Sequence, residues 1–335
     1  MRRYAAIAAA LAGAALVLSG CTSEGASDTA AEETAAAEAP AEEAPAAEAP
    51  AASDDCTYYW LAANITHPFY VEGKAGWNKA AEELGVKAEL VGPLDPDVQQ
   101  QVAFLEQIIA QPDQTCGLYM YAIDYNTVGP IMKKVREAGI PVINGNGDSE
   151  DKTIRDAFIG TDNVALGRAG SVLACDALGG KGTVGIVSFI TAQNHQERVR
   201  GFEEGIKANC PDVKVLPVSP NDGTAEGAFT AANGLITSNP DVNLIWATDA
   251  GSPGVARAVE ERDLVGKILV VGTDRTAEQI EAIKKGVVSA TITQDTTTEN
   301  YVGLYMLDWL RKGLQVPETV ITKSVVIDAN NVDTL

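Results

Sequence analysis

The sequence predicts an α/β protein built from two doubly wound lobes with parallel sheets, joined by a three-segment hinge, with a ligand cleft between them. Short apolar segments without polar alternation recur along the chain, which is typical of strands covered by helices on both faces. Helical patterns alternate with these segments, as in β-α-β units with right-handed crossovers. About 280 residues follow the N-terminal region, too many for one sheet of ordinary size, so we expect two lobes.

The expected elements follow one another in strict alternation from residue 57 onward. Strands are expected at 57–65, 87–91, 117–121, 141–144, 157–159, 183–189, 213–217, 244–248, 268–273, 289–293 and 323–327. Helices are expected at 71–84, 97–110, 125–138, 163–178, 195–209, 223–238, 252–262, 276–285 and 296–312. Gly85, Gly139 and Gly286 follow helical patterns and are typical C-terminal caps. A break between the two sets of units falls near 160–163.

The first 20 residues have the pattern of a secretory signal peptide. A short basic start precedes an apolar run, which is too short for a stable membrane span, and small residues end it. The run ends in Leu18-Ser19-Gly20-Cys21, which looks like a lipobox, the bacterial lipoprotein signal in which the cysteine is lipidated. We therefore expect Cys21 to carry a lipid anchor; the alternative is an ordinary signal peptide with an incidental cysteine.

Residues 21–55 have the composition of an extended, disordered stalk. They hold no aromatic residue and no aliphatic side chain larger than alanine, so they cannot bury enough apolar surface to order themselves. Of the 46 acidic residues of the chain, ten lie here without a single base. Without the signal and the stalk the net charge changes from −21 to −13, which argues against a nucleic-acid partner.

The four remaining cysteines suggest disulfides, because an even number is typical of an exported protein. Cys56 and Cys116 each precede an apolar strand, so parallel neighbours would place them at the same sheet edge. Cys175 lies in a helical pattern and Cys210 ends one. We predict the pairs Cys56–Cys116 and Cys175–Cys210; free or buried thiols are the alternative. Without a Cys-x-x-Cys or Cys/His cluster, we expect no metal.

The stretch 57–73 predicts one wall of a binding site. An uncharged strand is followed by a turn at Pro68, which exposes His67, Phe69 and Tyr70. Open α/β sheets bind ligands at the carboxyl ends of their strands, so we expect ligand contact here, with core packing the alternative for Phe69. The four tryptophans, Trp60, Trp77, Trp246 and Trp309, are expected in the core.

Motifs along most of the chain resemble those of one protein family. They are His-Pro-Phe-Tyr at 67–70, Gly-Ile-Pro-Val-Ile at 139–143, Phe-Ile-Gly-Thr-Asp-Asn at 158–163, Arg-Val-Arg-Gly-Phe at 198–202, Asn-Pro-Asp-Val at 239–242, Val-Gly-Thr-Asp at 271–274 and Ala-Thr-Ile-Thr-Gln at 290–294. In this order they resemble the periplasmic sugar-binding proteins of ABC transporters, of the ribose-binding type. The resemblance covers 57 to about 327 and implies a type I solute-binding fold with two Rossmann-like lobes.

The resemblance also implies a set of pocket residues. Phe69 and Tyr70 match the aromatic pair that stacks on a sugar ring, and His67 matches the polar residue before the proline. The sugar-binding arginine, aspartate and glutamine of the family are matched as follows: Arg198, Asp274 and Gln294. Thr248 and Asp249 occupy a loop where the family often has Asn-Asp. From the residues alone, Arg198 could lie on a solvated face and Asp274 could cap a helix.

One departure argues against ribose itself as the ligand. Asn146 and Gly147 fall where the ribose-type pattern has an Asp-Arg pair, and the aromatic residue expected near Asp222 is absent. Tyr121 could supply a substitute stacking face, and His195 lines the pocket or lies on the surface. The predicted ligand-binding residues are His67, Phe69, Tyr70, Tyr121, Asn144, Asn146, Asp148, His195, Arg198, Asp222, Thr248, Asp249, Asp274 and Gln294.

The sequence lacks the motifs that are typical of other classes of function. The glycine-rich segment 179–183 precedes a strand and has the wrong spacing for a P-loop, and no Gly-x-Ser-x-Gly elbow or His-Glu-x-x-His occurs. An enzyme is therefore not expected, and the export signal and missing helix-turn-helix exclude a transcription regulator. A receptor of the same fold that reports occupancy to a membrane sensor kinase or chemoreceptor is the alternative function.

These observations predict a monomeric, exported solute-binding lipoprotein, anchored to the outer face of the cell membrane or periplasmic. We expect it to capture a sugar or polyol without a cofactor and to deliver it to the permease of an ABC transporter, as the resemblance implies. The N-terminal lobe is expected to comprise 56–161 and 295–323. The C-terminal lobe is expected to comprise 162–294 and 324–335.

Overall fold

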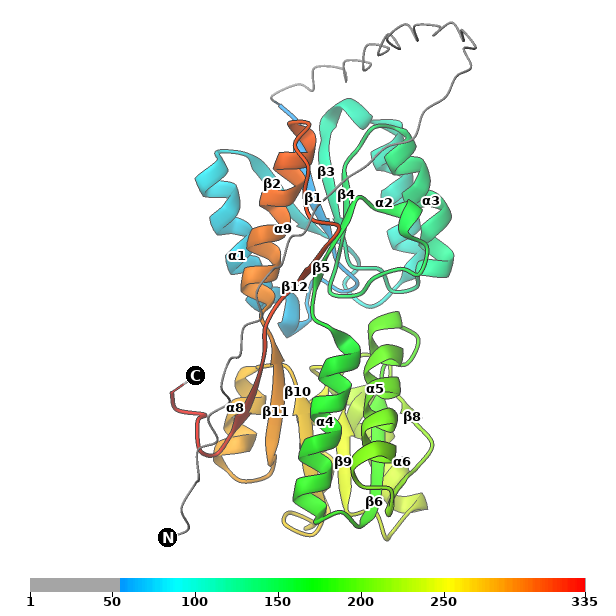
Figure 1. Cartoon of the computed structure of the whole chain (residues 1–335), viewed down its shortest axis with the longest axis vertical. Coiled ribbons are helices and arrows are strands. Elements are labelled where there is room, and N and C mark those ends of the chain that lie inside the picture. The colour runs from blue at the N-terminus through cyan, green and yellow to red at the C-terminus, as the bar shows by residue number, and fades with distance from the viewer. Residues whose placement is uncertain (1–54, 335) are drawn as a thin grey trace, which may run out of the picture. The chain divides into compact units, whose positions relative to one another are not determined.

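The computed structural model describes residues 55–334, which form two α/β lobes (Figure 1). One six-stranded sheet has the order β12-β5-β4-β3-β1-β2, and the other has β13-β11-β10-β9-β6-β7, with the short β8 beside β6. All pairings are parallel except that of β13 with β11, which is antiparallel. The fold class predicted from the sequence is confirmed. The predicted signal peptide, Cys21 and almost all of the stalk lie outside the described residues.

The N-terminal lobe contains two separate parts of the chain. Its elements are β1 (Thr57–Leu61), α1 (Pro68–Leu84), β2 (Lys87–Val91), α2 (Val98–Ala110), β3 (Thr115–Met120), α3 (Tyr125–Glu137), β4 (Val142–Gly145), β5 (Ala157–Gly160), α9 (Thr296–Arg311) and β12 (Thr319–Ile321), with single 3-10 turns at Pro112–Gln114 and Lys152–Ile154. Helices α1 and α9 pack together on one face of this sheet and α2 and α3 pack together on the other, as Figure 1 shows.

The C-terminal lobe repeats this plan. Its elements are α4 (Asn163–Leu178), β6 (Gly182–Ser188), α5 (Gln193–Asn209), β7 (Val213–Val215), β8 (Ser219–Pro220), α6 (Ala225–Ser238), β9 (Leu244–Ala247), α7 (Ser252–Glu261), β10 (Leu269–Thr273), α8 (Ala277–Lys284), β11 (Ala290–Gln294) and β13 (Ser324–Asp328). The chain crosses between the sheets three times: after β5, after β11 and after β12.

Both predicted disulfides are present. Cys56, directly before β1, and Cys116, within β3, have their Cα atoms 5.2 Å apart. Cys175 and Cys210 join α4 to the end of α5 across 5.8 Å between Cα atoms. The first pair follows from the parallel pairing of β1 with β3, which brings the two strand beginnings to one sheet edge.

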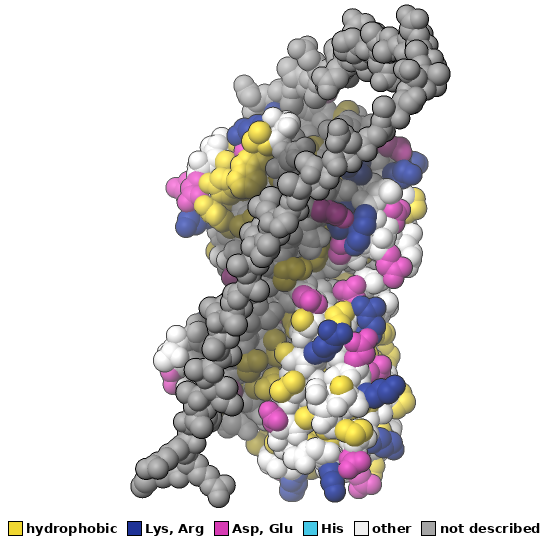
Figure 2. All heavy atoms as spheres, viewed as in Figure 1, with side chains coloured by type: hydrophobic (Ala, Val, Ile, Leu, Met, Phe, Trp, Pro, Cys, Tyr) yellow, Lys and Arg dark blue, Asp and Glu magenta, His cyan; other side chains and the backbone are white. Residues whose placement is uncertain are grey.

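Three of the four tryptophans are buried in the cores, but the expectation for Trp309 was wrong. Trp309 is 40% exposed. It follows Tyr301 and Tyr305 at four-residue spacing, so all three lie on one side of α9, where hydrophobic side chains gather at the surface in Figure 2. The opposite side of α9 packs on the sheet through Leu304 and Leu307. No helix within 55–334 is long and apolar enough to cross a membrane.

Candidate functional site

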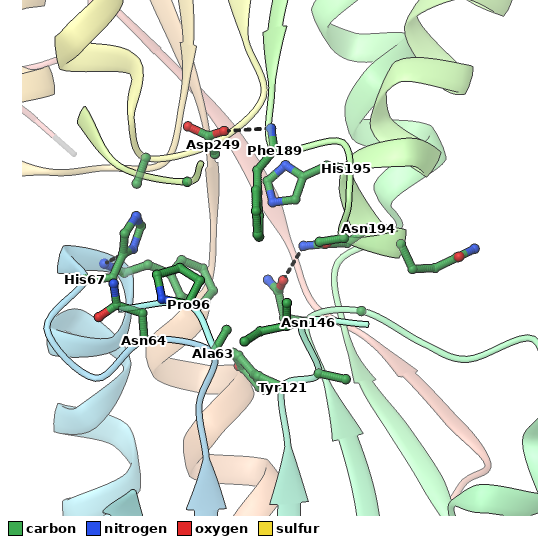
Figure 3. Close-up of a pocket in the computed structure, with 18 of the residues that line it drawn as sticks. Ala63, Asn64, His67, Pro96, Tyr121, Asn146, Phe189, Asn194, His195 and Asp249 are labelled. Atoms are coloured by element: carbon green, nitrogen blue, oxygen red, sulfur yellow. Dashed lines mark hydrogen bonds between the residues drawn. The ribbon is translucent and has the colours of Figure 1, made fainter. Parts of the chain in front are cut away.

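A cavity lies between the carboxyl ends of the strands of the two sheets. It has about 740 Å³ of space free of protein atoms, part of it open to solvent, a size typical of small-molecule sites. The loops after β1, β3 and β4 line it from one lobe, and those after β6, β9 and β10 line it from the other. Figure 3 shows His67 and Phe189 extending from opposite lobes toward the same space.

The turn between β1 and α1 presents one wall of this cavity. The side-chain oxygen of Asn64 accepts hydrogen bonds from the backbone N–H and the hydroxyl of Thr66, at 2.8 and 2.7 Å, and the strand has ended before it. His67 then caps α1, because its Nδ1 accepts the N–H of Phe69 at 3.4 Å. Pro68 occupies the first helical position, where a missing N–H costs nothing. The helix therefore begins three residues earlier than the sequence suggested.

Aromatic side chains form the apolar part of the same wall. Phe69, Tyr70 and Tyr121 are almost fully buried, and their rings pack edge-on or tilted with centroids 5.3–6.0 Å apart. The hydroxyl of Tyr121 points away from solvent and donates to the buried carboxyl of Glu299 on α9. This cluster gives the cavity a rigid apolar surface on the side of the N-terminal lobe.

Arg198 is the central cationic group of the cavity. It lies in α5, is only 1% exposed, and is fixed by three hydrogen bonds. Its Nε donates to Asn163, and its two terminal nitrogens donate to the Thr248 carbonyl and to Gln294, all at 2.7–2.8 Å. Burial lowers the pKa of Arg198, and the carboxylate of Asp274 opposes this shift. The guanidinium is therefore preorganised as a hydrogen-bond donor.

Amide side chains next to Arg198 connect the two lobes. Gln294, the last residue of β11, accepts from Asn146 at 2.9 Å and donates to Asp274 at 2.6 Å. Asn146 accepts in turn from Asn194 at 2.6 Å, the bond drawn between them in Figure 3. Asn146 has a φ of 62°, a left-handed conformation in which asparagine is among the favoured residues other than glycine. One network thus joins both lobes and a crossing segment.

The two aspartates of the cavity differ in how much hydrogen-bond acceptor capacity each carboxylate retains for a ligand. Asp249 is satisfied by the protein, since its oxygens accept from Gly251, Phe189 and Asn221 at 2.8–3.2 Å. Among the residues that the structure describes, only Gln294 donates to the carboxylate of Asp274, through one oxygen, which leaves acceptor capacity on the other. Burial raises the pKa of Asp274, although Arg198 and the bond from Gln294 oppose this rise.

The histidines lie on opposite sides of the cavity, His195 buried and His67 half-buried. His195 Nδ1 lies 3.0 Å from Thr248 Oγ1, and its pKa is held well below the usual value by burial and by Arg198. Burial also lowers the pKa of His67, against the attraction of Asp274 and Asp249. Both rings are therefore neutral at physiological pH and can form directional hydrogen bonds.

Ten of the predicted ligand-binding residues line the cavity, and four do not. Those that line it are His67, Phe69, Tyr70, Tyr121, Asn146, His195, Arg198, Asp249, Asp274 and Gln294. Those outside the lining are Asn144, Asp148, Asp222 and Thr248, and each of these makes hydrogen bonds within the protein instead.

The four residues outside the lining support its loops. Asp148 pairs with Arg155 at 2.6 and 2.7 Å and with Lys152, and Asn144 donates to it at 3.3 Å. Asp222 accepts from the N–H and hydroxyl of Thr224 in the turn before α6. The hydroxyl of Thr248 lies 3.0 Å from Nδ1 of His195 and supports that ring.

Fourteen lining residues were not predicted from the sequence, and Asn64, Phe189 and Asn194 are among those with polar or aromatic side chains. Phe189 directly follows β6, and Asn64 follows β1 within three residues, so the rule for strand ends would have found both. Asn194 lies in the first turn of α5 and has no such signal. Phe189 gives the C-terminal lobe an aromatic ring at the cavity, although the sequence has none near Asp222. Within 55–334 no cluster of three or more His, Cys, Asp or Glu side chains could hold a metal ion.

Comparisons with known proteins agree with this geometry. A family model described as periplasmic binding protein domain matches residues 58–315. The D-allose-binding periplasmic protein of Escherichia coli is 28% identical over 78% of this chain and 86% of its own length. The xylitol-binding protein of Mycolicibacterium smegmatis is 26% identical over 79% of this chain and 75% of its own.

Two solved structures are also similar. The glucose-galactose binding protein GanP from Geobacillus stearothermophilus superimposes with a TM-score of 0.78, at 25% identity, over 84% of this chain and 99% of its own. A chain of the XylFII-LytSN complex superimposes with a TM-score of 0.77, at 25% identity, over 82% and 98%. The allose, xylitol and glucose-galactose proteins are binding proteins by name, which supports a binding protein and not an enzyme.

Proposed function

The chain belongs to the periplasmic binding protein domain family, and from this premise we propose that it captures a neutral sugar or polyol in the cavity between its lobes. The observation that carries the proposal is the pairing of aromatic rings from both lobes with a rim of fixed polar groups. Sugars present an apolar ring face and a set of hydroxyls, and this lining matches both.

The charge balance of the cavity favours a neutral ligand. Arg198 is the cation, Asp249 and Asp274 are the carboxylates, and both histidines are neutral at physiological pH. A ligand carboxylate would be placed near two carboxylates in a buried site, where like charges repel strongly. The free oxygen of Asp274 and the guanidinium of Arg198 instead suit the hydroxyls of a neutral ligand as acceptor and donor.

Ligand capture is proposed to stabilise the closed arrangement of the lobes. The contacts from both lobes are made together only when the cleft is closed, so a ligand that uses both sets shifts the population toward that state. Asn146 is well placed for this role because it bonds to Asn194 and to Gln294, which belong to the other lobe. The closed form would then be the one that a membrane partner recognises.

The sequence of residues 1–55 suits a lipoprotein carried on an acidic stalk. We propose that the signal is cleaved before Cys21, that this cysteine is lipidated, and that the acidic stalk lifts the lobes from the membrane. The proposed partner is the permease of an ABC transporter, with the protein acting as a monomer. Globomycin treatment, which blocks lipoprotein signal cleavage, should leave an unprocessed precursor; processing that is unaffected would contradict the anchor.

A sensor role is the second candidate. The name of one similar structure, the XylFII-LytSN complex, describes an assembly of a similarly folded chain with another protein. In this alternative the closed form would bind a membrane sensor instead of a permease. Affinity capture of the tethered protein from its own membranes, with and without sugar, distinguishes the two through the class of membrane protein recovered.

The experiment that tests the binding proposal is a thermal-shift panel of pentoses, hexoses, deoxy sugars and polyols with the mature protein. A ligand at 100 times its dissociation constant adds about 2.7 kcal/mol of stability, which gives a measurable shift. We expect at least one neutral sugar or polyol to raise the melting temperature. A shift with nucleosides or amino acids only would refute the sugar proposal.

A further inference from the structure

The chain contains two histidines, and both line the same cavity from opposite lobes. His67 follows β1, and His195 lies in the first turn of α5. Figure 3 shows the two rings on either side of the cavity. Each ring has one nitrogen fixed by the protein, and a neutral imidazole carries its proton on only one nitrogen. The protein contacts therefore determine which hydrogen-bonding group each ring offers a ligand.

His67 is fixed as a donor toward the cavity. Its Nδ1 accepts the backbone N–H of Phe69, so this nitrogen cannot carry the proton of the neutral ring. The proton must lie on Nε2.

His195 is fixed in the opposite sense. Thr248 Oγ1 donates its single hydrogen to Ser188 Oγ at 2.8 Å, so toward His195 Nδ1, at 3.0 Å, this oxygen can only accept. The Thr248 backbone also acts to raise the pKa of the ring, against the larger effect of burial. The proton of the neutral ring therefore lies on Nδ1, and Nε2 is left with a free lone pair. No group within the described part of the chain hydrogen-bonds to that Nε2.

We propose that the relay from Ser188 through Thr248 makes Nε2 of His195 a dedicated acceptor for a ligand hydroxyl, while His67 supplies a donor from the facing lobe. Thr248 and Ser188 are positioning residues, and His195 determines specificity. The inference rests on the proposed function, because it assigns the ligand chemistry of that same cavity. It names the feature that the ligand must have: a hydroxyl that donates to His195.

The charged neighbours keep this arrangement in its neutral form. Arg198 lies close enough to His195 to disfavour a second proton, and burial acts in the same direction on the pKa of the ring. Around His67 the carboxylates of Asp274 and Asp249 act in the opposite direction, but burial is the larger effect on its pKa. A ligand with a deoxy or methoxy group at the His195 position should therefore bind about 10- to 100-fold more weakly, because Nε2 would be buried without a donor.

The direct test is nitrogen-15 NMR of the histidine rings in the mature, uniformly labelled protein without ligand. Two ring systems are expected at pH 7.5, one with the proton on Nε2 and one with it on Nδ1, and His67→Gln assigns them by removing the first. A protonated Nε2 on His195 would overturn the proposal. This NMR measurement needs no ligand, so a result that contradicts the tautomers is distinct from a sugar panel in which nothing binds.

Variants of Thr248 test the relay itself. Thr248→Val removes the hydroxyl at constant shape and should move the His195 proton toward Nε2, whereas Thr248→Ser keeps the hydroxyl and should keep the tautomer. Ser188→Ala, one step further out in the relay, should also weaken the preference for Nδ1–H. This variant tests the relay even if Thr248→Val fails to fold. With D-allose and xylitol as probes, whichever binds the wild type should bind Thr248→Val at least 10-fold more weakly and Thr248→Ser normally. An unchanged tautomer in both Thr248→Val and Ser188→Ala would refute the relay.

Discussion

Replacing Glu299 with glutamine should remove a pH dependence that this carboxyl imposes on the stability of the protein. Glu299 lies in α9 with no exposed surface. Its Oε1 accepts from the hydroxyl of Tyr121 and, at 3.4 Å, from that of Tyr119. Its Oε2 has no hydrogen-bond partner among the residues that the structure describes. Burial raises the pKa of Glu299 to about 8, although the bond from Tyr121 opposes the rise.

The size of the effect follows from linkage between protonation and folding. The pKa of about 8 in the folded protein lies above the ordinary value of 4.5, so the folded protein holds the proton more strongly. This stabilisation is complete below pH 4.5 and is lost as the pH rises through 8. Each pH unit in this window changes the free energy of unfolding by ~1.4 kcal/mol, and the change levels off above the folded pKa. From pH 6 to pH 9 the wild type should therefore lose about 3 kcal/mol relative to Glu299→Gln.

Urea denaturation followed by circular dichroism at pH 6, 7, 8 and 9 measures this difference. Other groups titrate in both proteins, so the difference between wild type and variant isolates Glu299. Glu281→Gln, which removes an exposed carboxyl from α8, controls for the loss of one negative charge. Parallel stability profiles for wild type and Glu299→Gln over this pH range would refute the reasoning.

Three further predictions concern the aromatic wall, the disulfides and a close contact. Phe189→Ala should weaken binding of the best neutral sugar by about 2- to 10-fold in calorimetry through loss of a stacking face, whereas Phe229→Ala, on Arg257, should not. The double change Cys175→Ser and Cys210→Ser, which opens a link across 35 residues, should cost about 3–4 kcal/mol in urea denaturation; equal stability would contradict it. Gly145→Ala should fail to fold or lose several kcal/mol, because its Cβ would lie 1.9 Å from the Tyr121 ring. The matched control Gly129→Ala meets no atom closer than 3.7 Å and should be neutral or slightly stabilising in the same thermal melt.

Local patterns were sufficient to predict the fold, because each element carries its own signal. Apolar strands without alternation and glycines after helices specify a doubly wound sheet wherever they occur. The strand at β13 was predicted, but its antiparallel pairing was not, and the short β12 was missed. Neither follows from a local pattern, because β13 is placed by pairing with β11 and β12 by pairing with β5.

Site residues were predictable where their position in the chain determined their role. His67, Asp249 and Asp274 follow strands, so topology places them near the cavity, although for Asp274 only the resemblance favoured ligand contact over a helix cap. Asp148 also lies in such a loop, but Arg155 turns it away from the cavity through a paired hydrogen bond. No local pattern shows that two residues seven positions apart will pair in this way. The role of Glu299 was equally hidden, because it depends on α9 packing behind Tyr121.

A crystal structure with the tightest-binding sugar or polyol of the panel tests the central proposal most directly. The account predicts a ligand between the lobes, with its apolar face toward Phe189 or the ring of Tyr121 and its hydroxyls bonded to Arg198 and Asp274. It also predicts a ligand hydroxyl on Nε2 of His195. Ligand density outside this cavity, or a ligand in it that touches neither Arg198 nor Asp274, would contradict the account.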